Sequence, residues 1–94
     1  MIDIILPEEM TPEFVALIPR QRAIVNKFMQ DGKISAYSLS LDRQRLWIIA
    51  NGANETDVRM MLMKFPLIAY MSPEIHELAF HNNMTLSFSQ ISLN

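Results

Sequence analysis

The chain reads LMKFPLIAYM from Leu62 to Met71, and this stretch decides how its second half is built. A helical apolar pattern ends at Pro66, because proline has no amide hydrogen and disfavours a helical residue before it. An apolar run then restarts at Leu67. We therefore expect a helix end, a connection and then the last core strand, which we place at Ile75 to His81.

Upstream of this stretch, the residue pattern predicts one helix and a hairpin of two strands. The helix should run from about Glu55 to Lys64, with Asn54 as its N-cap. Asp57 can hydrogen-bond back to Asn54, as in a capping box. The strands should span Ile34 to Leu41 and Arg45 to Ala50, joined by a turn at Asp42-Arg43-Gln44, because their apolar residues suit a sheet.

The first third of the chain predicts a strand followed by a longer helix. Alternation from Ile2 to Leu6 is typical of a strand. Thr11 before Pro12 marks a helix start, and helical spacing continues to Asp31-Gly32, where glycine can adopt a left-handed cap. Because Pro19 interrupts this pattern, we expect a kink or a break near Ile18.

The resulting order is βαββαβ, which predicts an α+β, ferredoxin-like fold with a four-stranded antiparallel sheet and two helices on one face. We expect a single domain over residues 1–94, with a core at 2–81 and an extra C-terminal strand in the tail 84–94. The alternative for this tail is a frayed terminus. The second face of the sheet would lack a cover within one chain, so we expect a homo-oligomer, a dimer or larger, in which two sheets form a dimeric α+β barrel.

Composition narrows the classes of function. Half of the residues are apolar and only 19% are charged, which favours self-association in so small a domain. The net charge of −2 and scattered basic residues argue against nucleic acid as a partner. With no cysteine, no basic leader and no apolar run near the roughly 18 residues of a membrane span, we expect a cytoplasmic protein without a membrane partner.

The two histidines, His76 and His81, suggest no metal site. Their odd separation places them on opposite faces if they share a strand, so they cannot bind one metal within a subunit. His81, at the predicted strand end, is a candidate for a lone acid or base, and so is Tyr37. The alternative for either histidine is a side chain satisfied by a backbone group.

Residues next to Pro19 and three aromatic residues are candidates for ligand contacts. A helix break would aim Gln21 and Arg22 into a cleft between helix and sheet, although a solvated basic face explains the same residues. Aromatic rings with polar atoms suit the lining of a small cavity, and equally a core or an interface. These residues are Tyr37, Trp47 and Tyr70.

Four segments together resemble the muconolactone isomerase family. They are Leu6-Pro7, Met10-Thr11-Pro12, Asp31-Gly32 and Leu62 to Met71, and the resemblance covers about residues 2–81. It implies a small ferredoxin-like protein that shifts a double bond in a lactone, needs no cofactor and assembles as dimers within larger rings.

The resemblance also implies a glutamate base in the middle of the first helix, where this chain reads Arg20-Gln21-Arg22. No acidic residue occurs between Phe14 and Gln30, so the proton acceptor of such an isomerisation is absent there. We therefore expect a muconolactone isomerase-like protein that binds a small lactone- or aromatic-derived molecule, as a divergent isomerase using His81, Tyr37 or Gln21. True muconolactone isomerisation is not expected.

Two non-catalytic alternatives remain. The chain would be an oligomeric module that keeps the pocket and binds its ligand without turnover. Otherwise it would be an accessory protein that assembles with partners through the sheet and the tail.

Overall fold

A computed structural model of the chain describes residues 1–79. Its elements follow the predicted order, with a short 3-10 helix, η1, added before the last strand. They are β1 (Ile2–Ile5), α1 (Pro12–Gln30), β2 (Ile34–Leu39), β3 (Arg45–Ala50), α2 (Glu55–Leu62), η1 (Ile68–Tyr70) and β4 (Ser72–Ile75).

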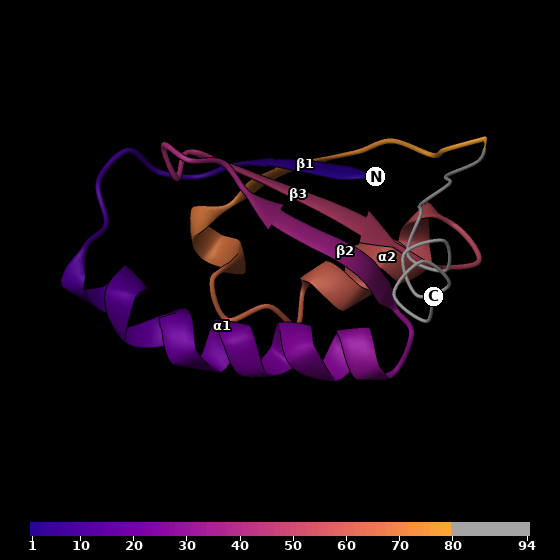
Figure 1. The fold of residues 1–94 in the computed structure, drawn as a ribbon, viewed down its shortest axis with the longest axis horizontal. Coiled ribbons are helices and arrows are strands. Elements are labelled where there is room, and N and C mark those ends of the chain that lie inside the picture. Colours follow the sequence, from indigo (N-terminus) through magenta and orange to yellow (C-terminus); the bar gives the residue numbers. More distant parts are fainter. Residues whose placement is uncertain (80–94) are drawn as a thin grey trace, which may run out of the picture.

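The four strands form one antiparallel sheet in the order β2-β3-β1-β4, and both helices lie on the same side of it (Figure 1). The ferredoxin-like α+β fold is thus confirmed. β1 pairs with both β3 and β4, which leaves β2 and β4 as the edges of the sheet.

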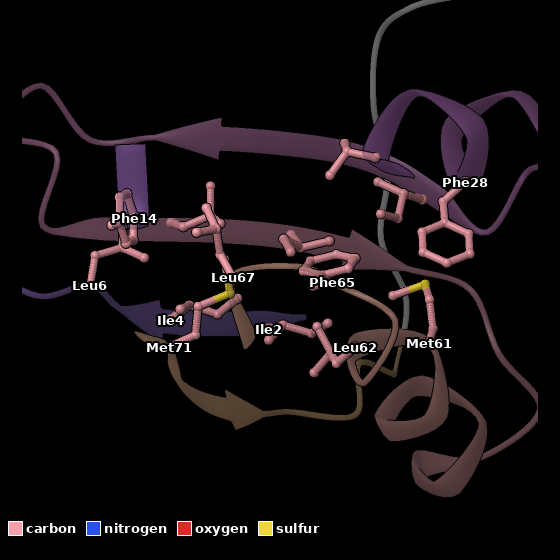
Figure 2. Close-up of a cluster of buried hydrophobic side chains, with 14 residues drawn as sticks. Ile2, Ile4, Leu6, Phe14, Phe28, Met61, Leu62, Phe65, Leu67 and Met71 are labelled. Carbon is pink, nitrogen blue, oxygen red and sulfur yellow. The ribbon is translucent and has the colours of Figure 1, made fainter. Parts of the chain in front are cut away.

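The core lies between the sheet and the helices (Figure 2). Ile2 and Ile4 of β1 are fully buried, and they pair across the sheet with Ile48 and Leu46 of β3. Directly paired residues share a face, so these four side chains form the inner face of the central strands. The helices and the segment after α2 cover them with Phe14, Val25, Phe28, Met61, Leu62, Phe65, Leu67 and Met71.

Helix α1 begins as predicted but is not broken at Pro19. The Thr11 hydroxyl accepts a hydrogen bond from the amide of Phe14 at 3.2 Å, which satisfies one free amide of the first turn. The helix then continues through Pro19 to Gln30, so the predicted break is wrong. Pro19 lies on the exposed side of α1. Proline has no amide hydrogen to donate to the Val15 carbonyl, and on this side that carbonyl can face water instead. The parts of the helix before and after Pro19 both pack against the core.

Helix α2 has the predicted N-cap and ends two residues before the predicted Lys64. The Asn54 side chain accepts from the amide of Asp57 at 2.9 Å. The Asp57 carboxylate reaches back to the amide of Ala53, at 3.2 Å, one residue earlier than a capping box requires. Both hydrogen bonds therefore join the loop before α2 to the first turn of this helix.

The hairpin of β2 and β3 matches its predicted turn, and β2 ends at Leu39 instead of Leu41. The turn is held by the Asp42 carboxylate, which accepts from the Ser40 hydroxyl at 2.6 Å and the Gln44 amide at 3.0 Å. These hydrogen bonds, chiefly the one from the Ser40 hydroxyl, lower the pKa of Asp42. Arg43 supplies the positive φ, 63°, that closes the turn.

The last strand lies earlier than predicted, at Ser72–Ile75 instead of Ile75 to His81. Its Pro73 is tolerated because β4 is an edge strand, which does not use every amide hydrogen. The four residues of β1 also limit how far β4 can pair, and Ile75 is opposite Ile2. Consequently the predicted placement of both histidines on one strand is wrong: His76 follows the strand, and His81 lies outside the described residues.

The predicted tail strand, at 84–94, also lies outside the described residues. Within residues 1–79, no helix is both long and apolar enough for a membrane crossing.

Replacing Phe65 tests the packing of the segment after α2. Its side chain is 1% exposed, so Phe65→Ala should lower the free energy of unfolding by about 3–5 kcal/mol through lost burial and a residual cavity. Urea unfolding followed by circular dichroism measures the change. Met63→Ala, at a position 75% exposed, is the matched control and should change stability by less than about 0.5 kcal/mol.

Candidate functional site

Gln21 is the only buried polar or charged residue among residues 1–79, with 3% of its surface exposed. Its two neighbours in the chain, Arg20 and Arg22, are exposed. Helix periodicity explains the difference, because Gln21 lies on the same side of α1 as the buried Phe14, Val25 and Phe28. Of the three residues highlighted in the sequence, only Gln21 enters the space between helix and sheet.

A backbone hydrogen bond orients the Gln21 amide. The amide of Leu67, in the segment after Pro66, donates to Gln21 Oε1 at 3.2 Å. The carboxamide oxygen is thereby directed to Leu67, and Nε2 is directed elsewhere. Gln21 Nε2 is buried and makes no hydrogen bond of good geometry, although the Tyr37 hydroxyl lies close to the carboxamide, and such a donor is unusual. A donor group is therefore available inside the protein.

Tyr37 lies beside Gln21. It is paired with Ile48 on β3 and so faces the helices from the edge strand β2. Burial raises the pKa of Tyr37, while a hydrogen-bonding contact with the Gln21 side chain acts in the opposite direction. The hydroxyl thus stays protonated at neutral pH, and it adds a second donor next to Gln21 Nε2.

Tyr70 lies in η1, three residues after Leu67, and contacts the start of α1. Its ring meets that of Phe14 edge to face, with centroids 5.4 Å apart and an angle of 79° between the planes. Tyr70 and Tyr37 are both only half-buried. Both tyrosines therefore remain partly accessible from the outside of the protein.

The structure does not bring the other predicted site residues to Gln21. Arg22 points to solvent from α1. Trp47 is paired with Asp3 and Ser38 and lies on the outer face of the sheet, between the inward-facing Leu46 and Ile48. His81 lies outside the described residues.

The inner face of α1 carries no carboxylate. Glu13 is the acidic residue of the first turn, and it is exposed. Residues 1–79 also contain no group of three or more acidic, histidine or cysteine side chains placed to hold a metal ion. The described side chains around Gln21 can donate hydrogen bonds and form apolar contacts, but they offer no anionic base.

A family model described as muconolactone delta-isomerase matches residues 1–84, nearly the whole chain. The chain belongs to this family. No curated protein matches it.

The contact of Gln21 with the Leu67 amide was not predicted. A backbone amide is present at every non-proline residue, so the sequence carries no signal for this partner. Only the position of Leu67 directly after Pro66 and its apolar character could suggest burial. The sequence likewise does not predict that Tyr37 and Tyr70 are half-buried, because their burial depends on how α1 crosses the sheet.

Ionisation of Tyr37 should destabilise the fold. Its pKa is raised in the folded protein above the usual value of about 10, so its contribution is fully present below pH 10 and is lost as pH rises beyond it. We expect the free energy of unfolding to fall less steeply above pH 10 in Tyr37→Phe than in the unmodified protein. Urea unfolding across this pH range measures it, with Tyr70→Phe as the matched control; identical slopes for the unmodified protein and Tyr37→Phe would contradict the assignment.

Proposed function

We propose that this protein binds a small lactone- or aromatic-derived molecule between α1 and the sheet, as a muconolactone isomerase-like protein. The observation that carries the proposal is the buried, unpaired Nε2 of Gln21 in a member of this family. A buried donor without a partner is destabilising by about 1–3 kcal/mol, and a ligand oxygen that accepts its hydrogen bond would remove that penalty.

The ligand requires an acceptor oxygen and an apolar body. Gln21 Nε2 and the Tyr37 hydroxyl are both donors, which suits a carbonyl or a carboxylate. The rings of Phe14 and Tyr70 offer an apolar contact surface on one side. Access from solvent would pass beside the half-buried tyrosines, with small shifts of their side chains.

Proton transfer by this site would be weak. A lactone double-bond shift needs a group that accepts a proton beside a carbonyl, and the carboxamide of Gln21 is not basic. A neutral Tyr37 can polarise a carbonyl by hydrogen bonding but does not replace a carboxylate. A divergent isomerase would therefore depend on Tyr37 or on His81 for its proton steps.

A second candidate function is binding without turnover. It is favoured by the absence of any acidic residue from Phe14 to Gln30, which leaves the inner side of α1 neutral. The protein would then act as an oligomeric ligand-binding or accessory protein.

We propose that the outer face of the sheet is covered by a second copy of the chain. This face carries Trp47, Ile49 and Ile5, of which Ile5 is 53% exposed. The same face holds an ion pair between Arg45 Nη1 and Asp3 Oδ2 at 3.0 Å, while Asp3 Oδ1 is buried without a partner. A donor from a second sheet would satisfy that oxygen. The lack of cysteine further suits an oligomer that works in the cytoplasm.

The ligand proposal is tested by titrating the protein with muconolactone and following binding by calorimetry and turnover by ultraviolet absorbance. We expect binding with little turnover. Gln21→Leu should weaken binding roughly tenfold, because one hydrogen bond to the lactone oxygen is lost. Arg22→Leu, which changes an exposed neighbour on the same helix, is the matched control.

Gln21→Glu places a carboxylate where the family resemblance implies the base. It should raise muconolactone turnover by about 10²-fold or more, the usual contribution of a positioned general base. If neither Gln21→Leu nor Gln21→Glu alters binding or turnover, Gln21 does not face the ligand. Rapid turnover by the unmodified protein would instead show that another residue is the base.

Assembly is tested by sedimentation velocity at micromolar concentration. The unmodified protein should sediment as a dimer or larger species, and Ile49→Lys should shift it toward the monomer by placing a charge in the buried interface. Met63→Lys, at an exposed position on the other side of the protein, should leave the assembly unchanged. A monomeric unmodified protein would contradict the covered-sheet proposal.

A further inference from the structure

A cavity lies away from Gln21, between the C-terminal end of α1 and α2. Its volume is about 320 Å³, which is within the range of small-molecule sites. It is lined by Phe28, Lys33, Asn51, Gly52, Asp57, Met60, Met61 and Lys64. None of the residues proposed for the helix–sheet site contributes to it.

The inner wall of this cavity is apolar. Phe28 and Met61 are 4% and 6% exposed, and they lie close together at one end of the core (Figure 2). Met60, in contrast, is 61% exposed, which is unusual for so large an apolar side chain. Methionine side chains adapt to differently shaped apolar partners. The cavity can therefore hold a flat or irregular apolar group.

Two lysines flank this apolar wall. The Lys33 ammonium lies 5.7 Å from the centroid of the Phe28 ring, where it is held over the ring face. Neither Lys33 nor Lys64 makes an ion pair with any carboxylate in residues 1–79. Two positive charges beside an apolar wall are complementary to a molecule that has both an apolar body and an anionic group.

The one acidic residue in the lining is already engaged. The Asp57 carboxylate accepts a hydrogen bond from the Ala53 amide at 3.2 Å and lies in the first turn of α2, where the helix dipole favours it. The carboxylate is thereby held at the helix start, and it forms no ion pair with Lys33 or Lys64. The local balance of the lining is one positive charge in excess.

We propose that this cavity binds a small aromatic carboxylate, with the ring against Phe28, Met60 and Met61 and the carboxylate between Lys33 and Lys64. The site is separate from the helix–sheet interior. It adds a second ligand position to each subunit, and its occupation does not require Gln21 or Tyr37.

Cinnamate and cinnamyl alcohol are matched probes, because they share an apolar body and differ in charge. Binding is followed by nuclear magnetic resonance of isotope-labelled methionine methyl groups in the full-length protein. Cinnamate should shift the Met60 and Met61 signals while leaving Met10, on the loop before α1, unchanged. The alcohol should bind at least about threefold more weakly, and added salt should weaken only cinnamate.

Substitution of the lysines tests the placement of the carboxylate. Lys33→Met and Lys64→Met should each weaken cinnamate about threefold, and together about tenfold, whereas the exposed Lys27→Met on α1 should have no effect. Gln21→Leu should also leave the Met60 and Met61 shifts intact, which separates this site from the proposed lactone site.

Three results with the probes and the lysine variants would overturn the proposal, and so would a fourth with Gln21→Leu. They are unshifted Met60 and Met61 signals at millimolar cinnamate, equal binding of cinnamyl alcohol, and unchanged affinity in the double lysine variant. Loss of the shifts in Gln21→Leu would also overturn it, because the two sites would then be one. If the protein does not bind a lactone at Gln21, the proposed function fails, but the cinnamate measurements still test this second site.

Discussion

The fold depends on the packing of residues 65–71 between α1 and the sheet. Helix α2 ends at Leu62, and the chain then passes Pro66 and returns under α1 with Phe65, Leu67 and Met71 buried. The rings of Phe65 and Phe28 lie 6.1 Å apart, so this segment connects the end of α1 to the end of α2. Burial of two such aromatic side chains contributes several kcal/mol, which makes this contact a large part of the core.

The same segment creates the polar interior. Because its backbone passes next to α1, the amide of Leu67 needs a partner, and the Gln21 oxygen provides it. The same carboxamide lies beside Tyr37 on β2. The side chain that satisfies the Leu67 amide is therefore the same one that would donate a hydrogen bond to a ligand. Under the proposed function, the packing of this segment and the recognition of the ligand would be linked through one side chain.

Much of the fold was predictable because it is local. The N-caps Thr11 and Asn54, the turn at Asp42 and the strand Arg45–Ala50 all lie where the sequence places them, since caps and turns depend on residues close in the chain. Two of the errors, the expected break in α1 and the placement of the last strand, involve proline. Pro19 is tolerated in α1 and Pro73 in β4, and in each case tolerance comes from exposure or an edge position that only the packed protein defines.

The sequence by itself determined the βαββαβ order, the family resemblance and the neutral character of α1 between Phe14 and Gln30. These properties follow from residue identity and short-range spacing. The tertiary structure alone decided that Gln21 is buried while Arg22 is exposed, that Trp47 lies on the opposite face of the sheet from Tyr37, and that Leu67 orients the Gln21 amide. Those outcomes depend on the rotation of one helix over the sheet and on contacts 46 residues apart, which short-range spacing does not specify.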